Sequence, residues 1–265
     1  MMYLRDDWQT PTYASVRGGF GEGLVEAAKQ DDRVVALSAD LVESVGFGEF
    51  AQRIGAPRLI EVGVAEQNLV TVASGLAAMG NIPFAASYAS FSPGRNWEQI
   101  RTTICLNNQP VKLVGSHAGL NVGPDGATHQ MLEDIALMRS LPNMVVLAPG
   151  DAHEAKLMAA AMVADSRPNY VRLPRADIPL FLNQATFEIG KSYTLRQGTD
   201  VALLGTGTMT YQLLLAAEIL ANQHSIQAEV VHFPTIKPLD EAAVLGAAQK
   251  CGRVVTELKD RKSVV

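Results

Sequence analysis

The chain has 265 residues, of which 48% are hydrophobic and 18% charged, and its net charge is -5. A chain of this size and composition is globular and can form one large domain or two modest ones. Its apolar runs are far shorter than the roughly 20 residues needed to cross a bilayer, and it has no long run of Lys or Arg. These features exclude a membrane span and a basic nucleic-acid-binding surface.

The N-terminal residues indicate the compartment, and the two cysteines fit no metal or redox motif. Asp6 and Asp7 stand where a signal peptide would need an apolar run, so we expect a cytoplasmic protein. Cys105 and Cys251 lie in apolar segments without the CxxC or CxxH spacing of a metal or redox site. We expect both to be buried free thiols.

Strand-like apolar runs alternate with helix-like amphipathic segments through the first two-thirds of the chain. In chain order the pattern predicts a strand at 33–39, a helix at 66–79, a strand at 83–87, a helix at 95–106, a strand at 111–116, a helix at 130–140, a strand at 144–148, a helix at 152–164 and a strand at 170–173. This alternation is typical of βαβ units on a parallel sheet.

A segment rich in Pro, Asn, Asp and Gln, residues 174–186, precedes a second α/β pattern. That pattern predicts a strand at 201–204, a Gly-rich turn at 205–208, a helix to about 223, a strand at 228–233, a helix at 240–250, a strand at 253–256 and a tail at 258–265. We therefore expect an α/β fold with two doubly wound, mostly parallel sheet domains, residues 1–180 and 181–265, the second of them incomplete.

A glycine-rich stretch from Ser116 to Gln130 contains His117, Asp125 and His129, and so two of the five histidines. It follows a predicted strand and precedes a helix, which places it at the carboxyl edge of a parallel sheet, where open α/β sheets bind ligands. Taken alone, the stretch is also explained as a turn at Asp125-Gly126 followed by a helix capped by Thr128.

The second candidate is Glu66, in the segment Glu61–Asn68, where a short apolar strand runs into a helix. An acidic side chain near a helix N-terminus is stabilised by the helix dipole alone. The position therefore fits either a structural or a functional carboxylate.

The two segments together resemble the pyrimidine-binding domain of transketolases. The order Glu61–Asn68, then Tyr88–Phe91, then His117–Gln130 is the order of that family, and the last segment matches its pattern THxxxxVGxDGxTHQ with Ser116 in place of the first threonine. The similarity covers roughly residues 10–180, and a weaker similarity to the family's C-terminal domain covers about 185–257.

The resemblance implies cofactor-binding roles. Glu66 would hydrogen-bond N1′ of the aminopyrimidine of thiamine diphosphate, and so serve as a catalytic residue together with His117. Tyr88 and Phe91 would flank the pyrimidine ring, although an ordinary core pair is the alternative, and Asp40 would neighbour the cofactor. The family often has a third aromatic residue where this chain has Gly94; Trp97 is the nearest aromatic that follows it.

The resemblance also implies a site for sugar phosphates. The residues placed on the sugar are His117, Asp125 and His129. Those placed on the phosphate are Arg17, Ser44 and Arg175, and arginine suits a phosphate because its planar fork donates two hydrogen bonds at once. Without the family, both arginines fit ordinary surface positions.

The diphosphate motif of transketolases is missing, because the chain contains no Gly-Asp-Gly. The resemblance therefore implies a split transketolase, in which an N-terminal subunit binds the diphosphate and Mg²⁺. This chain would contribute no metal ligand and would join that subunit in an α2β2 heterotetramer. The implied reaction is transfer of a two-carbon ketol unit between sugar phosphates, as in the pentose phosphate pathway.

Three alternatives stay open. A 1-deoxy-xylulose-5-phosphate synthase usually has an Asp-Arg pair where this chain has Ser116-His117. The β subunit of a 2-oxoacid dehydrogenase lacks the DGxTHQ loop in this form. A non-catalytic assembly subunit would not need Glu66.

Overall fold

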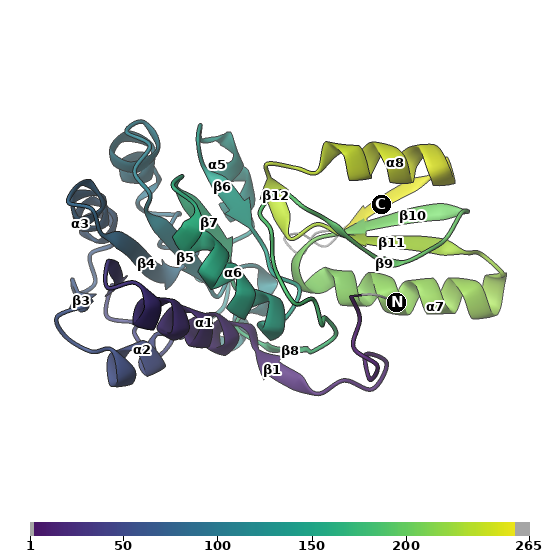
Figure 1. The fold of residues 1–265 in the computed structure, drawn as a ribbon, viewed down its shortest axis with the longest axis horizontal. Helices are drawn as coiled ribbons and strands as arrows, with labels where there is room; N and C mark the ends of the chain where they lie inside the picture. Colours follow the sequence, from purple (N-terminus) through teal and green to yellow (C-terminus); the bar gives the residue numbers. More distant parts are fainter. Residues whose placement is uncertain (1–2, 258–265) are drawn as a thin grey trace.

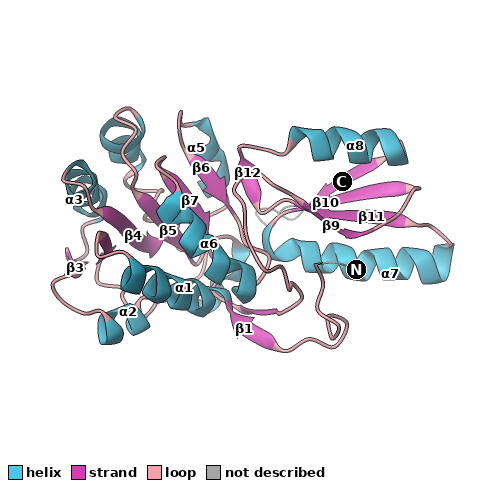
Figure 2. Ribbon diagram, viewed as in Figure 1, coloured by secondary structure: helices cyan, strands magenta, loops and turns pink. Residues whose placement is uncertain are grey.

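The computed structural model describes residues 3–257 and contains two large β-sheets with helices packed against them. A seven-stranded sheet and its helices lie on the left of Figure 1, and a four-stranded sheet lies on the right between α7 (Thr210–His224) and α8 (Glu241–Cys251). Figure 2 shows the same alternation of helix and sheet layers. The expected α/β class with mostly parallel sheets is confirmed. The predicted tail at 258–265 lies outside the described residues.

The seven-stranded sheet is parallel except at one edge, where β12 runs antiparallel to β6. Its strands, in spatial order, are β12 (Thr235–Lys237), β6 (Val145–Leu147), β7 (Asn169–Arg172), β5 (Lys112–Ser116), β4 (Ile82–Tyr88), β2 (Val34–Ser38) and β3 (Leu59–Glu61). Every residue of β2 and β5 is buried. Complete burial of this kind is typical of strands that are covered by helices on both faces.

Two apolar layers cover the two faces of this sheet. One layer includes Phe20 and Leu24 of α1 (Val16–Gln30) with Met158 of α6 (Ala152–Ala164). The other includes Leu69 of α3 (Glu66–Ala78) and Ile135 of α5 (Asp134–Ser140). Helices on both faces of a parallel sheet define the doubly wound arrangement. The remaining helices are α2 (Gly48–Arg53) and α4 (Trp97–Gln99), the latter continuing into a π-helical turn (Ile100–Cys105).

The four-stranded sheet has the spatial order β13 (Val254–Glu257), β10 (Val201–Gly205), β11 (Ala228–His232) and β9 (Tyr193–Arg196). Its first three strands are parallel and β9 is antiparallel. Leu203 packs with the α7 side and Leu204 with the α8 side, as expected for alternating residues of a strand. A small third sheet pairs β1 (Tyr13–Ser15) with β8 (Asp177–Pro179).

One strand crosses the expected division at residue 180. β12 follows the four-stranded sheet in the chain, but Thr235 pairs with Leu147 of the seven-stranded sheet. The Lys237 ammonium donates hydrogen bonds to the carbonyl oxygens of Arg139 and Leu141, at the end of α5. A cation at this position complements the negative end of the helix dipole. The division into 1–180 and 181–265 stays a prediction.

A buried polar network joins the two α/β units beside β12. His232 Nε2 lies 2.8 Å from the Glu154 carboxylate, and His232 Nδ1 lies 2.6 Å from the Thr210 hydroxyl. The Glu154 carboxylate also accepts hydrogen bonds from Gly150 N and Gln184 Nε2, each at 2.7 Å. Glu154 and His232 are fully buried, so each depends on these partners for the hydrogen bonds that water would otherwise supply.

Replacing His232 with alanine should lower the free energy of unfolding by about 3 kcal/mol, because it leaves the buried Glu154 carboxylate with fewer partners. Urea denaturation checks this value. The control is His224→Ala, at the end of α7, which should change stability by less than about 0.5 kcal/mol. Equal effects of the two substitutions would contradict the assigned role of the network.

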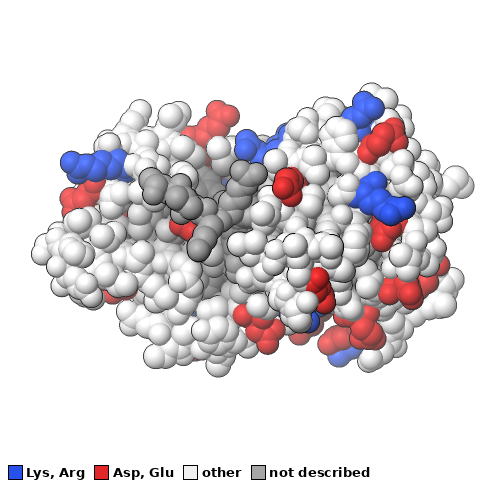
Figure 3. Space-filling view, turned by 180° about the vertical axis from the view of Figure 1, so that it is seen from behind, with Lys and Arg blue, Asp and Glu red and all other residues white. Residues whose placement is uncertain are grey.

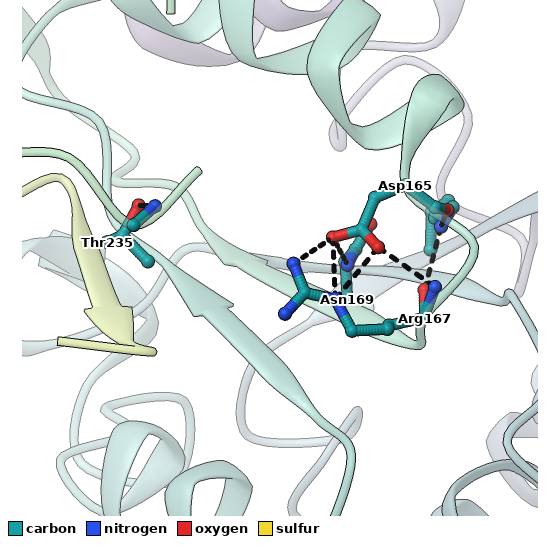
Figure 4. Close-up of polar contacts among 6 residues, drawn as sticks. Asp165, Arg167, Asn169 and Thr235 are labelled. Atoms are coloured by element: carbon teal, nitrogen blue, oxygen red, sulfur yellow. Dashed lines mark hydrogen bonds and ion pairs between the residues drawn. The ribbon is translucent and has the colours of Figure 1, made fainter. Parts of the chain in front are cut away.

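Hydrogen bonds made by the residues that follow α6 stabilise the amino-terminal edge of the seven-stranded sheet. The Asp165 carboxylate accepts hydrogen bonds from Arg167 and Asn169 (Figure 4). The buried Lys112 ammonium of β5 donates to the carbonyl oxygens of Asp165 and Arg167. Burial lowers the pKa of Lys112 to about 7.

Most predicted elements lie within a few residues of the observed ones. The helix predicted at 152–164 coincides with α6, whose N-terminus is capped by Asp151 accepting a hydrogen bond from Glu154 N at 3.0 Å. One expected helix start was wrong. The helix expected from residue 130 begins at Asp134. The segment 174–186, expected to separate the two α/β patterns, contains the short strand β8.

The surface agrees with the composition. On the face drawn in Figure 3, Lys and Arg side chains are scattered among Asp and Glu and do not form a single basic stripe. Within residues 3–257, no helix combines the length and the hydropathy needed to span a membrane.

Candidate functional site

Four rings meet at the carboxyl edge of the seven-stranded sheet. Tyr88 stacks on His117 with ring centroids 3.9 Å apart and lies nearly parallel to Phe91, with centroids 6.1 Å apart. His129 makes edge contacts with Phe91 at 5.2 Å and with Tyr88 at 6.1 Å. Because Tyr88 pairs with Ser116 across adjacent parallel strands, the residues that follow β4 and β5 come together. We call Tyr88, Phe91, His117 and His129 the ring cluster.

His117 has an unusual backbone and an unusual pKa. Its φ of 56° lies in the left-handed region, which residues other than glycine adopt only at a cost in conformational energy. Its Nδ1 lies 2.8 Å from the hydroxyl of the buried Ser116. Burial, together with the charges of Arg17 and Arg175, lowers the pKa of His117 to about 4. A neutral imidazole whose Nδ1 accepts from Ser116 carries its proton on Nε2, where it can donate to a ligand oxygen.

Acidification should destabilise the chain through His117. Its pKa is about 4 when folded and 6.5 in the reference state, so unfolding takes up a proton between these values. The stabilisation is complete above about pH 6.5 and is lost as the pH falls toward 4, which amounts to about 2 kcal/mol between pH 7 and pH 5. Urea denaturation at both pH values should show a smaller loss for His117→Gln than for the unmodified chain. Equal losses would contradict this assignment.

Two arginines lie beside the ring cluster. Arg17, on α1, donates hydrogen bonds to the carbonyl oxygens of Ser44 and, at 3.1 Å, of Arg175. Arg175 in turn donates to the carbonyl oxygen of Val122 in the glycine-rich loop. Burial lowers the pKa of Arg17, and the charge of Arg175 acts in the same direction. Two guanidinium groups near enough for the charge of one to lower the pKa of the other form a positive region suited to an anion.

The other predicted ligand residues, Ser44, Asp125 and Asp40, differ in their contacts with the two arginines and the ring cluster. Ser44 contacts Arg17 through its backbone carbonyl oxygen. Asp125 is exposed at the end of a 3₁₀ turn (Leu120–Asp125), and its charge raises the pKa of His117 against the larger opposite effects of burial and the arginines. Asp40 is exposed on the turn after β2 and, within residues 3–257, makes no hydrogen bond or ion pair with the ring cluster.

Glu66 is the first residue of α3 and is 5% exposed. Its backbone carbonyl oxygen accepts a hydrogen bond from Asn96 Nδ2 at 2.8 Å, and the same Nδ2 lies 3.2 Å from Ser92 Oγ. The fully buried Asn96 therefore ties the start of α3 to the segment that carries Phe91. Sequence reasoning missed Asn96, which lies inside the helix predicted at 95–106 and immediately precedes the observed α4.

A side chain at position 94 is sterically excluded, since a Cβ on Gly94 would collide with the carbonyl oxygen of Ser90. This explains why no aromatic residue stands there. Trp97 does not take that place in the described ring contacts. Its Nε1 donates to the carbonyl oxygen of Leu137 at 3.0 Å, and its ring packs with the apolar layer around α3 and α5.

The glycine-rich loop ends later in the chain than expected. Thr128 does not cap a helix at residue 130; its hydroxyl lies 3.0 Å from His129 Nδ1, and the helix begins four residues later at the buried Asp134. Sequence reasoning also missed Tyr170 and Arg172 of β7, which contact Asp134. The one signal in the sequence is the charge of Arg172 within the strand predicted at 170–173.

No group of three or more His, Cys, Asp or Glu residues that could hold a metal ion is found in the described part of the chain. Cys105 and Cys251 are buried free thiols, as expected.

Comparison with known families agrees with this geometry. The family model of the transketolase pyrimidine-binding domain matches residues 12–179. The model of the transketolase C-terminal domain matches residues 190–263. The first match contains the ring cluster, both arginines and Glu66.

Similar proteins include separate transketolase subunits. A protein described as a transketolase C-terminal section from Methanocaldococcus jannaschii is 43% identical over 235 residues, covering 88% of this chain and 74% of its own. The 6-deoxy-6-sulfo-D-fructose transketolase subunit SqwH from a Clostridium species is 41% identical over 254 residues, covering 96% and 76%. The 1-deoxy-D-xylulose-5-phosphate synthase of Trichormus variabilis is 39% identical, but the match spans only 38% of its length.

A solved structure described as a split gene transketolase, an inactive β4 tetramer, superimposes with a TM-score of 0.84 at 38% sequence identity. The match covers 91% of this chain and 78% of that one. The similarity in sequence and in fold therefore extends over both α/β units.

Proposed function

Since the chain belongs to the transketolase family, we propose that it is one subunit of a split, thiamine diphosphate-dependent transketolase that moves a two-carbon ketol unit between sugar phosphates. The observation that carries this proposal is the grouping of the ring cluster with Arg17 and Arg175 at the carboxyl edge of the seven-stranded sheet. We place the enzyme in the cytoplasm.

The residues around Glu66 fit an aminopyrimidine. Glu66 is buried at a helix start, and its backbone carbonyl oxygen accepts a hydrogen bond from Asn96, which also contacts Ser92 in the segment bearing Phe91. Asn96 Oδ1 is a buried acceptor without a partner among the described residues. Glu66 would share a proton with N1′ of the pyrimidine, and Tyr88 and Phe91 would contact its ring. Asp40 would neighbour the cofactor. Bound thiamine diphosphate supplies the nucleophilic carbon and the electron sink that cleavage of a ketose needs.

The cationic side of the site would hold the sugar phosphate. Arg17 and Arg175 would bind the phosphate with Ser44, because charge-assisted hydrogen bonds from guanidinium groups recognise oxyanions well. Neutral His117 would donate from Nε2 to an oxygen of the substrate, near the reacting carbon. Asp125 and His129 would bind sugar hydroxyls and the phosphate end.

The diphosphate and Mg²⁺ would be bound by a partner subunit. The chain has no Gly-Asp-Gly, and its described residues offer no cluster for a metal ion. A similar protein was solved as a β4 tetramer described as inactive, which fits a chain of this kind when it is alone. We propose an α2β2 heterotetramer with an N-terminal subunit.

A panel of donor substrates tests the reaction in the assembled enzyme. The proposal expects ketol transfer from xylulose 5-phosphate or a related anionic ketose to an aldose phosphate. A sulfonated ketose belongs in the panel, since one similar subunit is named for such a sugar. Condensation of pyruvate with an aldose phosphate would instead favour the synthase alternative, and oxidative decarboxylation of a 2-oxoacid would favour the dehydrogenase alternative.

A further inference from the structure

A fully buried carboxylate lies at the end of the loop that carries the candidate sugar-binding residues. Asp134 is the first residue of α5, and its Oδ2 accepts a hydrogen bond from the Tyr170 hydroxyl at 2.8 Å and lies 3.2 Å from Arg172 Nε. Tyr170 and Arg172 are two residues apart on β7 and therefore project from the same face of the sheet. Strand β7 thus holds the end of the loop formed by residues 117–133 through its two contacts with Asp134 Oδ2.

Tyr170 also lies against the beginning of the loop. A Cβ on Gly115 would collide with the hydroxyl and ring of Tyr170. Gly115 precedes Ser116 and His117, so the tyrosine that bonds Asp134 also packs beneath the backbone that leads into His117. Only glycine leaves room for the ring at this position.

The residues that follow Tyr170 and Arg172 continue the contacts. The carbonyl oxygen of Leu173 accepts a hydrogen bond from Ala118 N at 3.2 Å. Arg175 donates to the carbonyl oxygen of Val122. Gly119 N, near the start of the loop, donates a hydrogen bond of 2.8 Å to the carbonyl oxygen of Met131, near its end. One strand and its extension therefore contact the loop at its beginning, its middle and its end.

We propose that Asp134, Tyr170 and Arg172 are positioning residues, which fix loop 117–133 so that its His and Asp side chains face Arg175. The inference rests on the proposed function of the site. Burial raises the pKa of Asp134, and Arg172 and the Tyr170 hydroxyl oppose that shift. A buried ion pair adds little stability beyond what apolar residues of similar size provide, because desolvation offsets the attraction. Its contribution here is to select one arrangement of the loop.

The test uses Tyr170→Phe and Asp134→Asn in the assembled enzyme, which remove a hydroxyl or a charge and leave the shape nearly unchanged. Tyr193→Phe and Glu154→Gln are matched controls, because they alter a buried tyrosine and a fully buried carboxylate that lie outside the loop. The readouts are KM and kcat for the sugar phosphate, Kd for thiamine diphosphate, and amide hydrogen exchange of residues 117–133.

The two test variants should raise KM for the sugar phosphate about tenfold, with kcat changed far less and the Kd of thiamine diphosphate unchanged. Amide exchange in the loop should be faster in both. The controls should shift Tm without affecting KM or loop exchange. KM and loop exchange indistinguishable from the controls would overturn the proposal.

Failure of the proposed function is recognised separately. If the assembled enzyme with its natural sequence shows no ketol transfer, the reaction assigned above is wrong. The positioning role is then decided by hydrogen exchange alone. Faster exchange of residues 117–133 in Tyr170→Phe and Asp134→Asn than in the controls would support it, and equal exchange would overturn it.

Discussion

Replacing Glu66 with alanine in the assembled enzyme should lower kcat for ketol transfer about 10³-fold and leave Tm and assembly with the partner nearly unchanged. In the proposed site this carboxyl is the group that shares a proton with the aminopyrimidine. Glu66 is the one acidic residue in the first turn of α3. Stopped-flow or steady-state assays of the reconstituted complex measure the effect.

Glu61→Gln is the matched control for Glu66→Ala. Glu61 belongs to the same segment but is exposed at the end of β3. Its substitution should change kcat less than about twofold. A non-catalytic assembly subunit would tolerate both substitutions equally, so undiminished activity of Glu66→Ala would contradict the catalytic role of this chain.

Replacing Arg175 with alanine should raise KM for a phosphorylated ketose about 10²-fold. A charge-assisted hydrogen bond to an anion contributes about 1.5–3 kcal/mol, which corresponds to roughly 10–150-fold in affinity. Arg175→Lys should fall between the alanine variant and the natural enzyme, since lysine keeps the charge but loses the planar fork. Initial rates at varied substrate concentration measure each KM.

Two controls separate phosphate binding from general damage. Arg53→Ala removes an exposed arginine of α2 and should leave KM unchanged. A ketose without its phosphate should be used equally poorly by the natural enzyme and by Arg175→Ala. A KM that rises equally for both ketoses would contradict phosphate recognition by Arg175.

The apolar pattern predicted the scaffold because each element has a strong local signal. Strand β2 is a continuous apolar run, and α6 starts at an Asp that caps it, so both were placed within one residue. The carboxyl edge was also predictable, because parallel strands bring their following loops together. The strand pattern placed the loop with His117 at this edge, and the resemblance to transketolases added Glu66 and Tyr88 to the same site.

Contacts between distant segments could not be predicted in the same way. The Asp134–Arg172 pair joins a helix start to a strand that follows it by more than 30 residues, and neither position has a local signal. The crossing of β12 into the other sheet likewise depends on how two units pack. The resemblance to transketolases predicted roles for Arg17 and Arg175, but the carbonyl oxygens that hold them became visible only in the structure.

The late start of α5 has a specific tertiary cause. Thr128 and the Gly-rich residues before it favour a turn and a cap, which placed the helix near residue 130. In the structure Met131 is held by Gly119, and the helix starts only where Asp134 meets Tyr170 and Arg172. Tertiary contacts therefore override a local capping signal at this position.

We propose above all that this chain supplies the pyrimidine-binding half of a transketolase and needs a partner for the diphosphate. The most direct test purifies the chain alone and together with the proposed N-terminal subunit, and measures ketol transfer with thiamine diphosphate and Mg²⁺ present. We expect no activity from the chain alone and full activity from the mixture. Full activity of the chain alone, or none from a properly assembled mixture, would contradict the account.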